Sequence, residues 1–412
     1  MKGKRMVTGI AAGLGILVLS GCGGDTPKGK DSEIKYTIGV AVYDQENAEM
    51  QMFMNYYRDY IADGFPVKFY FSDALDSSED EEEFILEMKE NGAQGIISFY
   101  AQDIEAVTDL CREEEMYYIV GSGTISDEDF QQVKDNPYFL GTIGPDPADE
   151  TLAGEQMADY FSDDAAHSYL LLSGGARLDN FMHKSRTMGM LEALQENYGL
   201  QYSDTAEKLA SVQENTEIET GNDQISITIV PGFVNGEDGL ENLHTAFQEK
   251  EYDVILCSYG MNGLLDEISD QEELWGKDVK VGLVDCFSEY NFEKVKESGQ
   301  GGAPAFDYLT GKYASMIGPA FAAMYNAVSG QTDMIRPEGE AFRLYQSFWK
   351  SAGREEYAEM YGYTQGIYEN AYSNSDLMQV IKEYNPEADY ESFAQLTRSS
   401  DLESVKARIL NR

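Results

Sequence analysis

Residues 95–120 read GIISFYAQDIEAVTDLCREEEMYYIV, and they contain the pattern that decides the fold. The stretches 95–99 and 117–120 are short apolar runs typical of buried strands. The residues between them predict a helix over 104–115. A strand, a helix and a second strand of these lengths indicate a right-handed βαβ unit with parallel strands.

The same alternation continues on both sides of this unit. Before it, we expect strands at 36–42 and 67–71 and helices at 48–62 and 76–91. After it, the pattern starts again, with strands expected at 168–172, 225–230, 254–257 and 279–284 and helices at 181–197, 239–250 and 263–269. Two separate series indicate two α/β lobes, and the intervening stretch 141–149, which contains Pro145 and Pro147, is interpreted as a crossover.

The last quarter of the chain has a different character. Residues 307–328 predict one long helix rich in Ala, Met and Tyr. Residues 341–412 are mostly helical in pattern and strongly aromatic. We expect the helices at the end of the chain to pack across one lobe or the hinge, with the tyrosines forming their apolar surface.

Size and charge narrow the class of protein. The chain has 412 residues, more than the roughly 250–300 at which a single core usually splits, so two lobes are expected. It carries 74 acidic and 30 basic residues, a formal net charge of −44. Such a surface repels nucleic acid and anionic lipid headgroups, so no nucleic-acid partner is expected.

The N-terminal segment indicates export. Lys2, Lys4 and Arg5 are positively charged and residues 6–19 are apolar, which is typical of a secretory signal. The apolar run is too short for an ordinary membrane-spanning helix. The sequence Leu19-Ser20-Gly21 directly before Cys22 resembles the lipobox of bacterial lipoproteins. This resemblance implies that Cys22 becomes the first mature residue and carries lipid; an ordinary cleaved signal with a chance cysteine is the alternative.

Cysteine and histidine usage predicts neither a disulfide framework nor a metal site. Cys111, Cys257 and Cys286 are expected to be buried thiols, although a bridge between Cys257 and Cys286 stays open, because each follows an apolar strand pattern. The three histidines are far apart in sequence, so no cluster has metal-ligand spacing. We therefore expect no metal and no cofactor.

The order of several local patterns resembles a known family. The matching segments are residues 36–40, a first strand; 92–97, similar to G-x-D-G-I-I; 186–194, similar to R-x-x-G-F-x-x-A-L; 279–285, similar to V-x-V-V-G-F-D; and 299–311, similar to G-x-x-x-A-T-V-x-Q-x-P-x-x-x-G. Over residues 36–343, the chain resembles the class I periplasmic solute-binding proteins, the sugar-binding group related to ribose-binding protein and to the LacI repressors.

The resemblance implies an α/β fold of two doubly wound parallel-sheet lobes joined by a multi-crossover hinge, with an extra helical C-terminal segment. The expected division is 1–21 as signal peptide, 22–35 as flexible tether, 36–143 and 305–330 as lobe 1, 144–304 and 331–350 as lobe 2, and 351–412 as C-terminal extension. The resemblance also implies that the protein is anchored to the membrane, is not an enzyme, and passes a small, sugar-like ligand to an ABC permease.

Ligands of open α/β sheets bind beyond the carboxyl ends of the strands, so residues that follow strands are the candidates. These are Tyr43, Asp44, Tyr100, Gln102 and Ser122 in the first lobe, Arg177, Asp179, Phe181, Arg186, Asn262 and Asp285 in the second, and Phe306. Asp, Asn and Arg side chains suit sugar hydroxyls, and the Tyr and Phe rings suit the C–H faces of a sugar.

By matching with the family, Arg186 takes the place of its ligand-binding Arg and Asp285 that of its strand-end Asp, while Asn262 matches only loosely. Phe306 stands where the family has Gln, which favours a larger or less polar ligand than a simple pentose or hexose. The structural alternatives are a surface salt bridge for Arg186, a loop cap for Asp285, a plain turn position for Asp44, and a place in the core for Tyr100 and Phe306.

Three functions are compatible with this sequence. The first is a lipid-anchored receptor that delivers its ligand to an ABC importer, and the second is a sensing lipoprotein for a membrane kinase or chemoreceptor. The third is an extracellular enzyme of the glycosidase type, which needs a pair of carboxylates at one site. No nucleophile elbow and no zinc-protease motif occurs in the chain.

Overall fold

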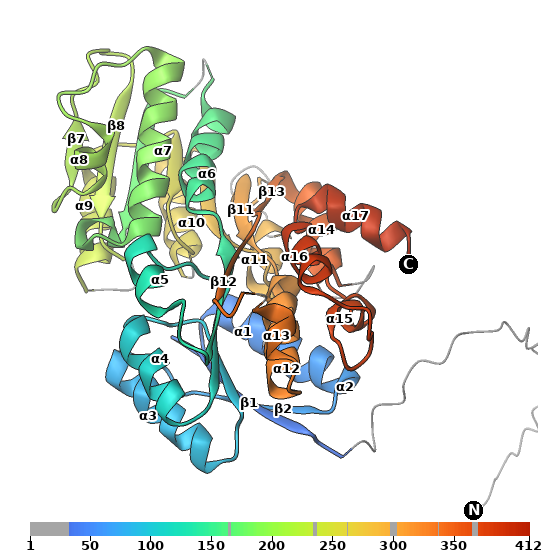
Figure 1. The fold of residues 1–412 in the computed structure, drawn as a ribbon. Coiled ribbons are helices and arrows are strands. Elements are labelled where there is room, and N and C mark those ends of the chain that lie inside the picture. Colours follow the sequence, from blue (N-terminus) through green and yellow to red (C-terminus); the bar gives the residue numbers. More distant parts are fainter. Residues whose placement is uncertain are drawn as a thin grey trace, which may run out of the picture.

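The computed structural model describes residues 33–163, 166–233, 237–261, 263–296, 303–336, 338–364 and 370–412 (Figure 1). The expected signal peptide, Cys22, most of the expected tether and Asn262 lie outside these ranges. Within the described ranges, no helix combines the length and the apolar character that crossing a membrane requires.

The first lobe is built on a six-stranded sheet with the order β12-β5-β4-β3-β1-β2. Its strands are β1 (Tyr36–Ala41), β2 (Val67–Phe71), β3 (Gly95–Ser98), β4 (Tyr117–Gly121), β5 (Phe139–Pro145) and β12 (Phe342–Gln346). All neighbouring pairs are parallel, with Ile38 of β1 opposite Phe69 of β2 and Gly95 of β3. The βαβ unit predicted from residues 95–120 is therefore present as β3, a helix and β4.

Helices cover both faces of this sheet. One face packs on α3 (Ser78–Glu90), α4 (Ile104–Glu113) and α5 (Asp127–Val133). The other packs on α1 (Ala48–Asn55), the π-helical segment η1 (Tyr56–Ile61), α2 (Ala62–Gly64) and α12 (Gly318–Val328). Successive strand residues point to opposite faces, so Ile96 contacts the first helical layer and Ile97 the second.

The acidic run at 76–83 begins a helix, as its pattern predicts. Ser77 and Asp80 form a capping box, and three acidic residues lie in the first turn of α3, where the helix dipole favours negative charge. The helix ends at Asn91, and Gly92 follows with a φ of 78°, which favours glycine.

The second lobe is built on a seven-stranded sheet with the order β13-β11-β10-β9-β6-β8-β7. Its strands are β6 (Ser168–Gly174), β7 (Thr216–Ile218), β8 (Ser226–Pro231), β9 (Val254–Cys257), β10 (Lys280–Cys286), β11 (Tyr308–Lys312) and β13 (Trp349–Ala352). The two edge strands, β7 and β13, are antiparallel to their neighbours. The predicted class, two parallel-dominated α/β lobes, is confirmed.

The helices of the second lobe also form two layers. One contains α6 (Pro147–Phe161) and α7 (Phe181–Tyr198), with the short α8 (Ala206–Ala210) against α7. The other contains α9 (Glu237–Glu249), α10 (Leu264–Trp275) and α11 (Glu289–Lys296).

The chain crosses between the sheets after β5, after β11 and after β12. Two strands therefore belong to the other lobe than the one to which the sequence assigned them. β11, inside the segment 305–330 assigned to lobe 1, pairs with β10 of the second sheet. β12, inside the segment 331–350 assigned to lobe 2, pairs with β5 of the first sheet. Both strands lie next to a connection between the two sheets. A short apolar pattern predicts a strand there, but it does not reveal which sheet the strand joins.

The C-terminal extension packs on both lobes at the hinge, as expected from its tyrosines. It contains α14 (Gly353–Thr364), α15 (Asn374–Val380), α16 (Tyr390–Arg398) and α17 (Leu402–Leu410), which lie beside α12, α13 (Thr332–Ile335) and β12 (Figure 1). α14 contacts α11 of the second lobe, whereas α15 contacts α12 and α16 contacts β12 of the first. Tyr357 and Tyr372 are completely buried, so one continuous core joins the two lobes and the extension.

Candidate functional site

Side chains from both lobes meet where β1 and β11 end. α1, which follows β1, contacts β10 and α11 of the second lobe. Lys312 ends β11, and its ammonium lies 2.9 Å from a carboxylate oxygen of Glu49 on α1. The two side chains are only 12% and 17% exposed. The pair therefore links the lobes through a largely desolvated contact.

Tyr43 and Asp285 belong to the same cross-lobe cluster, which we define as Tyr43, Glu49, Asp285 and Lys312. Asp285 lies on β10 one position before Cys286, the residue opposite Lys312 in the strand register. Burial, and then the charge of Glu49, raises the pKa of the Asp285 carboxyl, although the N–H of Met261 donates to it at 3.3 Å. Burial and the charge of Glu49 also raise the pKa of Tyr43. The structure thus brings two predicted residues together with an ion pair that sequence reasoning missed.

The turn after β3 is held by a buried network. The hydroxyl of Ser98 accepts from the backbone N–H groups of Tyr100 and Ala101, each at 3.1 Å, and donates to Glu81 at 2.6 Å. Tyr118 donates to the same Glu81 oxygen at 2.7 Å. Ala101 has a φ of 45°, a left-handed conformation that costs free energy in a residue with a side chain.

The hydroxyls of Tyr100 and Ser122 are buried and make no hydrogen bond to the described residues. Ser122 follows β4 and, like Ala101, has a left-handed backbone, with a φ of 59°. A buried hydroxyl without a partner is costly, so both groups are suited to a ligand or a water molecule. The other predicted residues of this lobe, Asp44 and Gln102, are exposed.

In the second lobe, the segment after β6 contains three predicted residues. Phe181 is 53% exposed, Asp179 is exposed with a φ of 59°, and Arg177 is half-buried. Each lies beyond the carboxyl end of the strand, as predicted, and their ligand roles stay predictions.

An aromatic cluster that sequence reasoning missed lies beside this segment. The ring centroids of His183, Phe233 and Tyr259 are 5.3–5.7 Å apart. His183 Nδ1 accepts the N–H of Gly175 at 3.0 Å, and burial together with Arg186 lowers the pKa of His183 to about 3, so the imidazole is neutral. Phe233 lies three residues after the strand predicted at 225–230, and this position near a strand end could have marked it as a candidate.

Arg186 is part of a buried internal network. Its Nε lies 2.5 Å from a Glu150 oxygen, its Nη1 donates to the carbonyl of Ser258 at 2.8 Å, and the residue is 6% exposed. Arg186 therefore makes a buried ion pair and not the surface salt bridge that was the structural alternative, and its ligand role stays a prediction. Phe306 is 1% exposed and packs edge-to-face on Tyr357 in the core.

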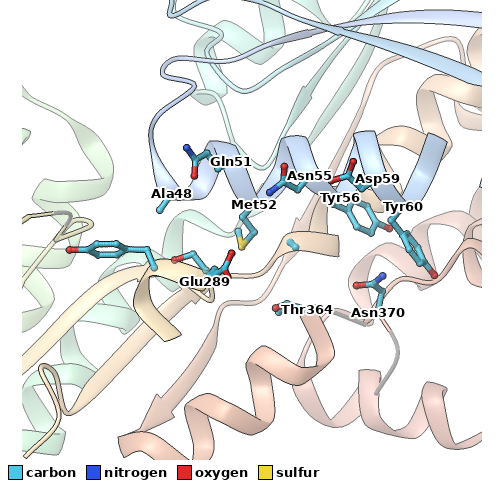
Figure 2. Close-up of a pocket in the computed structure, with 13 residues that line it drawn as sticks. Ala48, Gln51, Met52, Asn55, Tyr56, Asp59, Tyr60, Glu289, Thr364 and Asn370 are labelled. Atoms are coloured by element: carbon cyan, nitrogen blue, oxygen red, sulfur yellow. The ribbon is translucent and has the colours of Figure 1, made fainter. Parts of the chain in front are cut away.

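A separate pocket of about 520 Å³ lies between the lobes, beside the extension (Figure 2). Its walls come from α1 and η1, from the start of α11, from Ala314 after β11, and from Thr364 at the end of α14 and Asn370. None of the predicted site residues lines it. The sequence contained no signal for this pocket, because segments far apart in the chain form it.

Cys111, Cys257 and Cys286 are buried free thiols. Cys257 lies opposite Leu283 on the neighbouring strand, so Cys286 is three residues, about 10 Å, out of register with it. The separation explains why no bridge forms. In the described part of the chain, no group of three or more His, Cys, Asp and Glu side chains is arranged to hold a metal ion.

No family model and no curated protein matches the chain. Solved structures do match. A galactofuranose-binding protein has 13% sequence identity and a TM-score of 0.55, over 81% of this chain and 99% of that one. An ABC transporter periplasmic solute-binding protein from Actinobacillus succinogenes 130z with bound D-allose has 13% identity and a TM-score of 0.56, over 79% and 100%.

The periplasmic binding protein of the arabinose ABC transporter from Shewanella sp. ANA-3, bound to L-arabinofuranose, has 13% identity and a TM-score of 0.55, over 80% and 96%. These matches span nearly the whole of each relative and both lobes of this chain. At this level of identity the likeness concerns architecture. The protein has the fold of the class I periplasmic binding proteins.

Proposed function

We propose that the protein is a lipid-anchored extracytoplasmic receptor that captures a small, sugar-like ligand between its lobes for an ABC importer. The observation that carries the proposal is the cross-lobe cluster, in which Tyr43 and Glu49 of one lobe meet Asp285 and Lys312 of the other. A ligand that bonds to groups of both lobes binds one interlobe arrangement best, and therefore stabilises it.

The side chains at the strand ends suit a polyhydroxylated ligand. Asp285 offers carboxylate oxygens as acceptors, and the hydroxyls of Tyr100 and Ser122 lack partners in the described structure. Phe233 and Phe181, 42% and 53% exposed, offer aromatic faces to C–H surfaces. The sugars bound by the structural neighbours agree with this chemistry.

The first experiment is a calorimetric titration with L-arabinose, D-galactose, D-allose and myo-inositol. We expect one of these ligands to bind, and Asp285→Asn to weaken that binding by about tenfold, which equals about 1.4 kcal/mol. The control is Asp270→Asn, the same change at an exposed residue of α10. No binding of any sugar, or equal affinity in Asp285→Asn, would remove the support for this ligand class. Unchanged sugar after long incubation is expected of a receptor.

The anchor and the transporter need tests in cells. We expect a palmitate analogue to label the wild-type chain and not Cys22→Ser, and the variant to leave the membrane fraction. Deleting the protein is expected to reduce uptake of the radiolabelled ligand. Unchanged uptake would favour a sensing role over import.

A further inference from the structure

The pocket beside the hinge has a floor and a rim of different character. The floor contains Met52, Tyr56, Ser288 and Thr364, each at most 5% exposed. The rim contains exposed polar side chains of both lobes (Figure 2). Because the first lobe, the second lobe and the extension all contribute walls, the pocket exists only when the three are assembled.

The charged groups that line the pocket in the described part of the chain are all negative. Asp59 on η1 and Glu289 at the start of α11 line the pocket, and neither forms an ion pair within the described chain. No lysine or arginine of the described chain lines it.

Two cations close to lining residues are engaged elsewhere. Arg58 lies over the ring of Phe71, 5.3 Å from its centroid, and donates weakly to Asn55 at 3.4 Å. Lys294 lies 5.9 Å from the centroid of Tyr290 and is held by Asp266 at 2.6 Å. The pocket therefore has a negative potential that no side chain of the lining balances.

A buried amide also lacks a partner. Asn370 lines the pocket and is only 6% exposed, yet its side chain makes no hydrogen bond to any described residue. Its amide is therefore free to bond to an occupant of the pocket.

The aromatic walls suit a cation. Tyr56 and Tyr60 are stacked, with ring centroids 5.5 Å apart. Tyr56 donates its hydroxyl to the carbonyl of Tyr372 at 2.8 Å, and the Tyr60 hydroxyl accepts the N–H of Asn374 at 3.2 Å. With its hydroxyl engaged, the half-buried Tyr60 offers mainly ring surface to the pocket, and Tyr56 supports that ring from behind; aromatic ring faces attract organic cations.

From the cavity, the unbalanced carboxylates, the tyrosine rings and the unpaired Asn370 amide, we propose that this pocket is a second binding site, for a small organic cation of the substituted-ammonium class. The site is distinct from the cross-lobe cluster and does not depend on the sugar proposed for it. Its occupant contacts both lobes and the extension, so it stabilises their assembled arrangement.

The test titrates the full chain with choline and with its uncharged isostere 3,3-dimethyl-1-butanol. We expect saturable choline binding with a Kd below about 1 mM and at least about tenfold weaker binding of the isostere. The double variant Asp59→Asn/Glu289→Gln is expected to weaken choline binding by about tenfold. Asn370→Leu, which removes the amide and keeps the size, should also weaken it.

The matched control is Asp63→Asn/Glu293→Gln. It changes the same net charge near the same segments at exposed residues that do not line the pocket, so it isolates the local carboxylates from the overall charge of −44. Three results would overturn the proposal: no saturable choline binding, equal binding of choline and the isostere, or equal weakening by the two double variants. If Asp285→Asn binds choline with the same affinity as the wild type, this site is separate from the proposed sugar site.

Discussion

Replacing Lys312 by methionine should destabilise the protein by about 2–3 kcal/mol, because it leaves Glu49 partly buried beside Asp285 without a counter-charge. The ion pair spans 2.9 Å, for which Coulomb's law at an effective dielectric constant of about 20 gives about 6 kcal/mol before desolvation. Desolvation offsets most of this energy, since the side chains are only 12% and 17% exposed. We therefore expect a net coupling between the two residues of about 1–2 kcal/mol.

The assay is a double-mutant cycle of Lys312→Met, Glu49→Gln and the double variant, with urea unfolding followed by tryptophan fluorescence. The double variant should be less destabilised than the sum of the single variants. The control is Lys208→Met, whose ion pair with Asp204 is 71% and 43% exposed and should contribute less than about 1 kcal/mol. Additivity of the single variants within about 0.3 kcal/mol would refute the role of the pair in joining the lobes.

Three further predictions concern the site and its surroundings. Burial raises the pKa of Asp285, so the folded protein loses stability as the pH rises through that pKa. Asp285→Asn should therefore have a higher melting temperature than the wild type at pH 7, and this difference in melting temperature should shrink as the pH falls towards 3.8. A difference that does not change with pH would contradict the assignment. Arg186→Met should destabilise by about 3–5 kcal/mol, because Glu150 is left 2% exposed without a partner, and a stable variant would show that the network is dispensable. Truncation after residue 364 removes the carbonyl to which Trp349 Nε1 donates at 2.9 Å, so the melting temperature should fall; an unchanged value would mark the extension as a loose appendage.

Local patterns were sufficient to predict most of the sheet architecture. The apolar runs at 95–99 and 117–120 became β3 and β4, and the helix between them is α4. These predictions succeeded because strand and helix periodicity depends on neighbours in sequence, which a single chain displays. The helix predicted at 307–328 was wrong at its start, where β11 occupies Tyr308–Lys312 and pairs with β10. There, pairing with a distant strand decided the conformation.

The candidate site was predicted only in part, since strand ends can be located from sequence but their partners cannot. Tyr43 and Asp285 were selected as strand-end residues, and the structure places both near Glu49, while their ligand roles stay predictions. Glu49 and Lys312 were missed, because 263 positions separate them. Phe306 is a core residue because it packs on Tyr357 of the extension. No local sequence pattern reveals this contact. The pocket beside the hinge depends on the same long-range packing.

The most direct test of the central proposal is a crystal structure of the full chain with the sugar that binds most tightly. We predict that the sugar lies between the two sheets and contacts residues of both lobes, with Asp285 within hydrogen-bonding distance of a hydroxyl. A sugar bound to one lobe only, or bound away from the strand ends, would contradict the proposal that the two lobes form a clamp around their ligand.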